Sequence, residues 1–514
     1  AAPKPPCLSG REMFSQRLLF FCFQNVIIIT EIIRSSISLN PPLFSLPAGR
    51  QVLINAMLNF LDPIVSLAKR RGFVFQSSEI YGGLSSCYDF GPLGVELKNN
   101  VKKMWWKAMV QDRDDVVGLD AAILMHPKVW EASGHIDGFT DPLVDCKGCK
   151  KRWRADHLLE AKGIKPDFRP GDWKKQDVVC PDCGGELTDI RKFNLMFKTE
   201  MGVIEDSTST IYLRPETCQG IYVNFLNVLQ ATRKKLPFGI AQIGKAFRNE
   251  ITPGHFIFRT REFEQMEQQY FINPKDKKKC FEDWMEARKK WYLDLGIKKE
   301  NLRFREHEKH ELAHYAARAF DIEYNYPGMG FKELAGVHDR GDWDLSRQSK
   351  FSGQDLSYFD QESKEKFIPH IVETSDGADR AMLAFFVDAY EEVEARSGDD
   401  EAKHETEVVL RLHKSLAPIK IAILPLSKKE PLQKLSNEIQ TVLRAKWMTQ
   451  YDETGSIGKR YRRQDEIGTP YCVTIDFDSL EDKKVTVRDR DTMKQERIAI
   501  GELKEYLGEK LLNF

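Results

Sequence analysis

Apolar residues recur with helical or strand spacing along most of the chain after residue 60. Segments 61–71 and 93–111 carry apolar side chains every three or four positions, which predicts amphipathic helices. A strand is predicted at 116–125, ending at Pro127. Further helices are predicted near 217–233, at 277–295 and at 378–396, and strands dominate 210–272 and 303–372.

From Pro418 onward the pattern becomes a regular alternation of strands and helices. Strands are predicted at 419–424, 471–475 and 484–488, and helices at 430–446 and 501–512. Such an alternation predicts a separate small α/β domain, which we place at 415–514.

Composition narrows the class of protein. With 514 residues the chain is too long for one hydrophobic core, so about three or four domains of roughly 100–200 residues are expected. Apolar residues make up 41% and charged residues 30%, which excludes disordered and collagen-like chains. No apolar run approaches the ~20 residues that span a bilayer. The 77 basic and 77 acidic residues balance, so any contact with nucleic acid must come from a local basic patch.

Residues 1–56 differ from the rest, with proline clusters and apolar stretches interrupted by Gln24, Asn25 and Glu31. A secretory signal peptide would need an uninterrupted apolar stretch and a small-residue cleavage site, and neither is clear here. We therefore expect an extension that is not part of the folded protein, with Met57 as the natural start. A targeting peptide and a genuine appended element are the alternatives.

Four of the ten cysteines form two C-x-x-C pairs, Cys146/Cys149 and Cys180/Cys183. Two such pairs complete the tetrahedral four-thiolate shell that structural Zn²⁺ prefers. A closed shell leaves no open position for water, so we predict a structural zinc in a zinc-ribbon-like insertion at 142–192. The Lys and Arg residues of this segment either contact RNA phosphates or form a solvated face that offsets the thiolate charge.

The most specific stretch is a predicted β-hairpin around the Pro-Gly pair at 253–254. Period-two alternation puts Arg248 and Glu250 on one face of the first strand, and Phe263 and Glu267 on one face of the second. Cations, carboxylates and an aromatic ring make a poor core face, but they suit a ligand with a phosphate, a flat base and an amine. A solvated hairpin with ion pairs is the alternative.

These patterns resemble the class II aminoacyl-tRNA synthetases. Phe247-Arg-Asn-Glu250, a loop and Arg259-x-x-x-Phe263-x-x-x-Glu267 resemble their second signature motif, Pro127 after the helix at 93–111 resembles the first, and Ser375-Asp-Gly-Ala-Asp-Arg380 resembles the third. The details are most similar to the homodimeric type of glycyl-tRNA synthetase, through stretches at 78–83, 89–96, 130–135, 213–217, 333–336 and 468–472. The resemblance covers the chain from about 61 to 510.

The resemblance implies an α/β (α+β) fold with a six-stranded antiparallel catalytic sheet at 57–141 and 193–400, and an anticodon-binding domain at 415–514. The implied activity is that of a glycine–tRNA ligase. Glycine and ATP would form glycyl-adenylate, and the glycyl group would pass to the 3′ end of tRNA-Gly. A cytoplasmic homodimer without a membrane partner is implied as well.

The resemblance also implies roles for motif residues, with Arg248, Glu250 and Arg380 as the catalytic ones. Arg248 would bridge the glycine carboxylate and the α-phosphate, while Arg259 and Arg380 would hold the γ-phosphate. Phe263 and Arg380 would sandwich the adenine, and Glu250 would face its exocyclic amine. The rest of the implied ATP site is Asn249, Phe258, Leu334, Gly377 and Glu333, the last of which would hold Mg²⁺ on the phosphates.

For glycine, the resemblance implies three ammonium-facing carboxylates with a serine, an aromatic ring and a closing arginine: Glu216, Glu267, Glu373, Ser375, Phe263 and Arg154. Arg154 could equally be an ordinary basic residue of the zinc insertion. Larger amino acids are excluded by bulk, so no editing domain is expected. Thr374 replaces the usual proline of the third motif, so the local turn is expected to differ.

The basic run at 458–463 interleaves cations with Tyr461 and would suit contact with unstacked anticodon bases, although charge runs are usually solvated surface. Three other interpretations stay open: an inactive synthetase-like RNA-binding or polymerase accessory protein, a class II synthetase for threonine, serine or proline, and a zinc-dependent RNA-binding module. The motif arginines and glutamates favour an enzyme, and the three glutamates favour glycine.

Overall fold

The computed structural model describes residues 61–164, 177–202, 209–251, 254–308, 312, 317–394 and 406–512. The predicted N-terminal extension, residues 1–56, lies outside these ranges. Within them, no helix is both long and apolar enough to cross a membrane.

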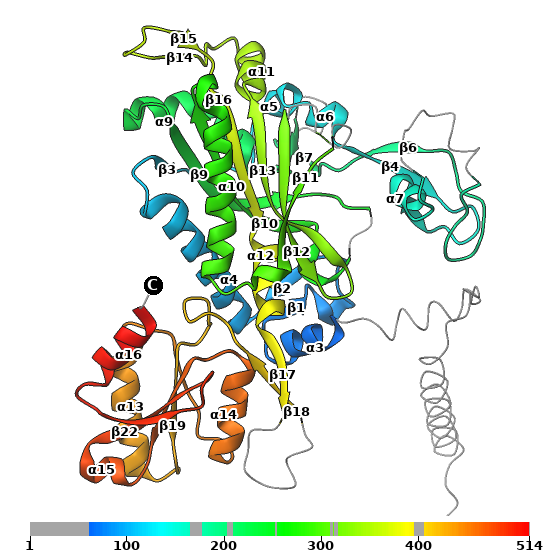
Figure 1. Cartoon of the computed structure of the whole chain (residues 1–514). Helices are drawn as coiled ribbons and strands as arrows, with labels where there is room; N and C mark the ends of the chain where they lie inside the picture. The colour runs from blue at the N-terminus through cyan, green and yellow to red at the C-terminus, as the bar shows by residue number, and fades with distance from the viewer. Residues whose placement is uncertain are drawn as a thin grey trace, which may run out of the picture. The chain divides into compact units, whose positions relative to one another are not determined.

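A seven-stranded sheet organises the larger part of the fold (Figure 1). Strands β11 to β9 are mutually antiparallel, which confirms the predicted six-stranded antiparallel sheet, and β3 adds a parallel edge strand beside β9. The order is β11 (Leu302–Glu306), β12 (Arg318–Tyr326), β13 (Gly330–Gly341), β16 (His370–Gly377), β10 (Glu262–Ile272), β9 (Phe238–Phe247) and β3 (Val116–Gly118).

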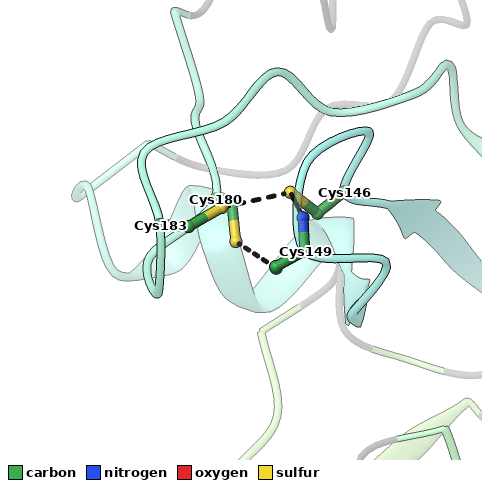
Figure 2. Close-up of side chains that lie close together, drawn as sticks. All are labelled: Cys146, Cys149, Cys180 and Cys183. Carbon is green, nitrogen blue, oxygen red and sulfur yellow. Dashed lines mark hydrogen bonds between the residues drawn. The ribbon is translucent and has the colours of Figure 1, made fainter.

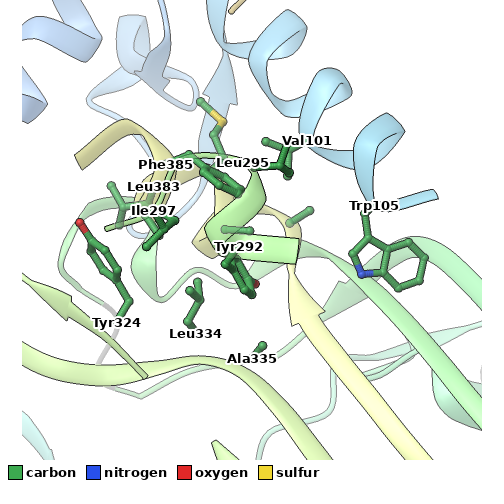
Figure 3. Packing of buried hydrophobic residues seen from close by; sticks show 14 of the residues in the cluster. Val101, Trp105, Tyr292, Leu295, Ile297, Tyr324, Leu334, Ala335, Leu383 and Phe385 are labelled. Carbon is green, nitrogen blue, oxygen red and sulfur yellow. The ribbon is translucent and has the colours of Figure 1, made fainter. Parts of the chain in front are cut away.

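One face of this sheet carries the main hydrophobic core (Figure 3). Trp105, Tyr292 and Phe385 are buried there, and they come from helices α4 (Pro92–Trp106), α10 (Lys277–Asp294) and α12 (Ala378–Ala389). Each large apolar side chain buried in this way contributes about 1.5–3 kcal/mol. Even-numbered β10 residues such as Met266 enter this core. Because side chains alternate along a strand, Phe263 and Glu267 are on the opposite face, here called the site face.

Several helices differ in extent from the predicted ones. The helix predicted at 93–111 is α-helical over α4 and ends in a π-helical turn, Lys107–Gln111. Residues 217–233 form two helices, α8 (Cys218–Val223) and α9 (Phe225–Thr232). The helix predicted at 378–396 stops at Ala389, because the next residues form strand β17 (Tyr390–Glu394) paired with β18 (Thr406–Leu410).

The strand predicted at 116–125 is too long, since β3 ends at Gly118. Pro127 begins helix α5 (Pro127–Ala132) instead of ending a strand. Proline suits a first helical position because the N–H that it lacks has no partner there. Helix α11 (Trp343–Ser352) is not predicted from the sequence, because two of its three buried residues, Asp344 and Gln348, are polar.

The cysteine segment builds a small three-stranded sheet, and the C-terminal segment a five-stranded one with its own core. The predicted C-terminal strands and helices are all present. The cysteine segment contains β5 (Arg152–Arg154), β4 (Thr140–Asp145), β6 (Arg191–Asn194) and α7 (Ala155–Glu160). The C-terminal segment contains β20 (Thr449–Tyr451), β19 (Ile421–Pro425), β21 (Tyr471–Ile475), β22 (Lys484–Asp489), β23 (Gln495–Ala499), α13 (Glu430–Arg444), α14 (Ile457–Glu466), α15 (Asp478–Asp482) and α16 (Leu503–Leu512).

The remaining α-helices and β-strands of the described residues are short. They are α3 (Asp62–Arg70), β1 (Val74–Gln76), β2 (Tyr88–Phe90), α6 (His135–Gly138), β7 (Lys198–Glu200), β8 (Thr210–Tyr212), β14 (Tyr358–Phe359) and β15 (Lys366–Phe367).

Candidate active site

A polar cavity lies on the site face of the large sheet. It brings together most of the residues predicted for the site: Glu216, Arg248, Glu250, Phe258, Arg259, Phe263, Glu267, Glu333, Leu334, Glu373, Ser375, Gly377 and Arg380. Its wall also contains Ile257, Thr260, Gln265, Gly336, His338, Arg340 and Asp379, which are not among the predicted site residues.

The pairing of strands β13 and β16 explains why two of the residues that were not predicted, Gly336 and His338, line the cavity. Gly336 is the register partner of Ser375, and His338 is the register partner of Glu373. No local pattern reveals this pairing, because it joins strands that are distant in the sequence. Gln265 is different, since it lies between Phe263 and Glu267 on the site face and alternation alone could have found it.

Glu373 is a buried carboxylate with both oxygens engaged. Its Oε1 accepts from His338 Nδ1 (2.7 Å), and its Oε2 accepts from Arg340 (3.0 Å) and from Gln269 Nε2 (2.8 Å). Burial alone would raise the pKa of Glu373, but the charge of Arg340 and the bond from His338 outweigh it and lower the pKa to about 2. Glu373 is therefore an anion held in a fixed orientation.

Glu216 is a second anion of the cavity. Its Oε1 accepts from Cys218 Sγ (2.9 Å) and Gln219 Nε2 (3.1 Å), and His135 Nε2 lies 3.4 Å away. Burial opposes ionisation, but the charges of His135 and Arg340 hold the pKa of Glu216 well below its usual range.

Glu267 completes this acidic trio with the opposite shift. Its oxygens accept from the Thr217 hydroxyl and from Gln269 Nε2 (3.1 Å). Burial and the charges of Glu373 and Glu216 raise the pKa of Glu267 well above its usual range. Two anions and a carboxyl whose ionisation they oppose form a site suited to a small cation.

Arg248 and Glu250 lie just beyond the end of β9, so the predicted strand alternation between them is wrong. The chain turns there, and the Glu250 N–H donates to the Arg248 carbonyl (2.8 Å). Both residues nevertheless line the cavity. Arg248 Nε donates to the Pro215 carbonyl (3.0 Å), and its guanidinium lies 5.4 Å from the Phe263 ring centroid.

Arg380 is held by two neighbours. Its guanidinium contacts Glu333 Oε2 (3.1 Å) and lies 4.5 Å from the ring centroid of Phe258. The charge of Arg380 lowers the pKa of Glu333. Arg380 and Glu333 thus neutralise each other in this structure, and each is available to a ligand once the pair opens.

Two predicted residues are not part of the cavity wall. Asn249 uses its backbone N–H to bond the Leu195 carbonyl (2.8 Å). Arg154 forms ion pairs with Asp141 (2.9 Å) and Asp156 (2.6 Å). Arg154 thus links Asp156 of the cysteine insertion to Asp141 of the catalytic segment.

The four predicted cysteines converge (Figure 2). Their Sγ atoms all lie within 4.8 Å of one another, with Cys146–Cys183 at 3.5 Å and Cys149–Cys180 at 3.6 Å. The Cys149 N–H donates to Cys146 Sγ (3.4 Å), and this bond lowers the pKa of Cys146 to about 6. The donor set and its spacing fit one tetrahedral metal ion, because Zn–S bonds of about 2.3 Å place sulfurs just under 4 Å apart.

Basic residues around the cysteines are largely paired. Lys147 pairs with Glu186, Lys151 with Asp182, and both Arg152 and Arg191 with Asp145. This pairing favours the solvated-face interpretation over contact with RNA. Lys174 and Lys175, which belong to the same basic set, lie outside the described residues.

The basic run at 458–463 is also engaged within the fold. It lies in helix α14, where buried Arg460 donates to the Pro425 carbonyl (2.6 Å). The Tyr461 hydroxyl bonds Thr474 (2.6 Å), and Arg463 pairs with Asp452 (2.5 Å). Three residues of the run are thus engaged within the domain, while contact of the run with RNA bases stays a prediction.

Comparison with known proteins agrees with the resemblance to class II aminoacyl-tRNA synthetases. Residues 197–390 match the family described as tRNA synthetase class II core domain (G, H, P, S and T), and residues 420–510 match the one described as anticodon binding domain.

The chain is 54% identical over 455 residues to a glycine–tRNA ligase of Thermobifida fusca, covering 88% of this chain and 98% of the relative. It is 57% identical over 462 residues to that of Acetivibrio thermocellus, with the same coverage. The prolyl-tRNA synthetase of Cryptosporidium parvum, solved with halofuginone and AMPPNP, shares the fold with a TM-score of 0.58 at 18% identity, over 88% of this chain and 78% of that chain. The chain therefore belongs to the glycine–tRNA ligase family of class II aminoacyl-tRNA synthetases.

Proposed function

We propose that this protein is a glycine–tRNA ligase that converts glycine and ATP to glycyl-adenylate and pyrophosphate, then transfers the glycyl group to tRNA-Gly. The observation that carries this proposal is the buried acidic trio in the same cavity as Arg248, Arg259 and Arg380. A small ammonium compound and a polyphosphate are the ligands whose charges fit these two sets of side chains.

Adenylation needs positioning and charge stabilisation more than covalent help. A glycine carboxylate oxygen attacks the α-phosphorus, and the bond to the bridging oxygen breaks. Arg248 is placed to bond the carboxylate and an α-phosphate oxygen together, a two-pronged task that suits guanidinium. Arg259 and Arg380 bind the γ-phosphate, and Phe263 and Glu250 bind the adenine.

Glu333 is the residue that would hold Mg²⁺ with ATP. Its carboxylate is half exposed in the cavity wall. Among the described residues, its only ion-pair partner is Arg380, which Mg²⁺ would have to displace. Mg²⁺ favours one or two carboxylates together with phosphate oxygens, which fits this single donor. Bound there, the ion would offset charge on the β- and γ-phosphates.

Glycine selection follows from charge and space. Glu216, Glu267 and Glu373 bind the ammonium, with Ser375 beside them. A Cβ atom added at Gly336 would lie 2.7 Å from the His338 ring, so a larger residue at this position would crowd His338 in the cavity wall. We expect larger amino acids to be excluded by bulk, which needs no editing step.

The pH dependence of glycine binding should reveal the proton on Glu267. Its raised pKa means that the empty site binds a proton that the glycine ammonium must displace. Below that pKa, the KM for glycine should fall by up to about tenfold for each unit of rising pH. Glu267→Gln should abolish this slope, measured as KM from ATP–pyrophosphate exchange at several pH values. If the KM for glycine and the KM for ATP changed with pH in the same way, the pH dependence could not be assigned to the proton on Glu267.

We also propose that the cysteine cluster binds one structural Zn²⁺. The convergence of four sulfurs, which together complete a tetrahedral shell, supports a structural role. Purified protein should contain about one zinc per chain, and Cys180→Ser should lose most of it because three thiolates bind zinc far more weakly. Cys280→Ser, which changes a cysteine of helix α10, is the control. Equal zinc content in both variants, measured by plasma mass spectrometry, would rule out the four-thiolate site.

The finer assignments rest on similarity to the glycine–tRNA ligases over 88% of the chain. We infer a cytoplasmic homodimer that recognises tRNA-Gly. The domain limits that we propose are 57–141 and 193–400 for catalysis, 142–192 for zinc and 415–514 for the anticodon. The last of these contains the segment that matches the anticodon-binding family.

The function is tested by ATP–pyrophosphate exchange with each amino acid in turn. Glycine alone should support exchange, because the proposed site binds the ammonium through the acidic trio and excludes larger side chains by bulk. Exchange with serine, threonine or proline in place of glycine would favour another class II synthetase. No exchange with any amino acid, together with retained tRNA binding, would favour an inactive RNA-binding relative.

A further inference from the structure

A second cavity adjoins the nucleotide site. It lies between helix α7, the loop that precedes β10 and the β12–β13 turn. Phe258 and Arg259 line both cavities, so the two share a wall. Its full lining is His157, Gly254, His255, Phe258, Arg259, Gly328, Met329 and Lys332: two permanent cations, two histidines and no acidic residue among these described positions.

The two permanent cations of this cavity, Arg259 and Lys332, are not ion-paired within the described ranges. Within the described ranges, the side chains of Arg259 and Lys332 form no hydrogen bond or ion pair, whereas Arg380 is held by Glu333. Burial and the charges of Arg259 and Lys332 lower the pKa of His255. Cations gathered in one concave space repel each other and raise the local concentration of anions.

Acidic groups near the rim do not cancel this charge. Asp141 and Asp156 are already ion-paired with Arg154. At His157, burial and the charges of Arg154 and Arg259 lower the pKa, and only partial opposition comes from Asp156 and Glu160 on its own helix. The field inside the cavity therefore stays positive.

The backbone beside the cavity is held in an unusual conformation. His255 and Phe256 both have left-handed φ angles, 57° and 58°, although neither is glycine. Such residues cost about 1–2 kcal/mol each and persist where surrounding structure fixes them, often at ligand-binding loops. The strained turn places His255 in the cavity wall next to Arg259.

We propose, building on the function proposed above, that this cavity receives inorganic pyrophosphate as it leaves the nucleotide site. When the glycine carboxylate attacks the α-phosphorus, the bridging oxygen keeps the bonding electrons and leaves as part of pyrophosphate. Arg259, which lines both cavities, contacts the departing polyanion, and Lys332 and His255 bind it next. Two cations without an ion-pair partner and two histidines around one cavity match a compact, multiply charged anion better than a nucleic-acid strand with one charge per phosphate.

The test is the behaviour of Lys332→Met, which keeps the aliphatic stem and removes the charge. Lys350→Met, an exposed lysine on helix α11, is the matched control. Enzyme carrying preformed glycyl-adenylate is mixed with pyrophosphate, and ATP formation gives the half-saturating pyrophosphate concentration. That concentration should rise about tenfold in Lys332→Met, as expected for loss of one charge-assisted contact. The KM for ATP should change much less, and His255→Gln should show a weaker change in the same direction.

Direct binding separates this proposal from the proposed function. Titration calorimetry of pyrophosphate with the full-length protein should show weaker binding for Lys332→Met than for Lys350→Met, even if wild-type protein activated no amino acid. Unchanged pyrophosphate affinity in both cavity variants would overturn the proposal. Equal losses for ATP and pyrophosphate, or a loss confined to tRNA, would also overturn it, because the cavity would then serve the bound triphosphate or the RNA.

Discussion

Replacing Arg248 by alanine should lower glycine-dependent ATP–pyrophosphate exchange at least about 100-fold, because a preorganised donor at the reacting centre is worth roughly 3 kcal/mol. Arg248 lines the cavity, and its guanidinium is fixed by the Pro215 carbonyl and by the ring of Phe263. The effect should appear mainly in kcat, since the contact strengthens as charge develops on the α-phosphate.

The conservative and control variants sharpen this prediction. Arg248→Lys should recover little of the activity, because an ammonium group cannot bond the carboxylate and the α-phosphate as a planar fork does. Arg303→Ala removes an exposed arginine of β11 that pairs with Glu323, and it should leave exchange nearly unchanged. An Arg248→Ala enzyme with nearly normal kcat and an unchanged thermal midpoint would show that the role assigned to Arg248 is wrong.

Local patterns predicted the features of the site that depend on nearby residues. The four cysteines were identifiable because their spacing itself encodes a chelate. Phe263 and Glu267 share a face because β10 is a regular strand there. Motif resemblance then placed Glu216 and Glu373 in the same cavity, although they lie far apart in the sequence.

Features that depend on long-range packing could not be predicted in this way. His338 and Arg340 support Glu373 only through the register of β13 against β16. Arg460 belongs to the basic run at 458–463, but helix α14 turns its side chain inward onto the Pro425 carbonyl. In both cases tertiary contacts, which no local spacing records, decide what a polar side chain does.

Replacing Asp376 by alanine should destabilise the protein by about 3–5 kcal/mol, the usual cost of leaving one buried charge without its partner. Asp376 and Arg288 form an ion pair, and neither side chain is exposed. The same carboxylate accepts from Trp105 Nε1 (3.1 Å) and from the Tyr292 hydroxyl (2.6 Å). One side chain thus joins α4 and α10 to strand β16, directly behind Ser375.

Urea unfolding followed by tryptophan fluorescence would measure the loss, with Asp294→Ala as the matched control. Asp294 lies on α10 like Arg288, but its pair with Lys290 (2.6 Å) is exposed and should be worth only about 0.3–0.5 kcal/mol. The double variant Asp376→Leu/Arg288→Met should recover much of the stability, because removing both charges also removes their desolvation cost. If that double variant were as unstable as Asp376→Ala, the loss would come from packing around β16 and not from an unpaired arginine.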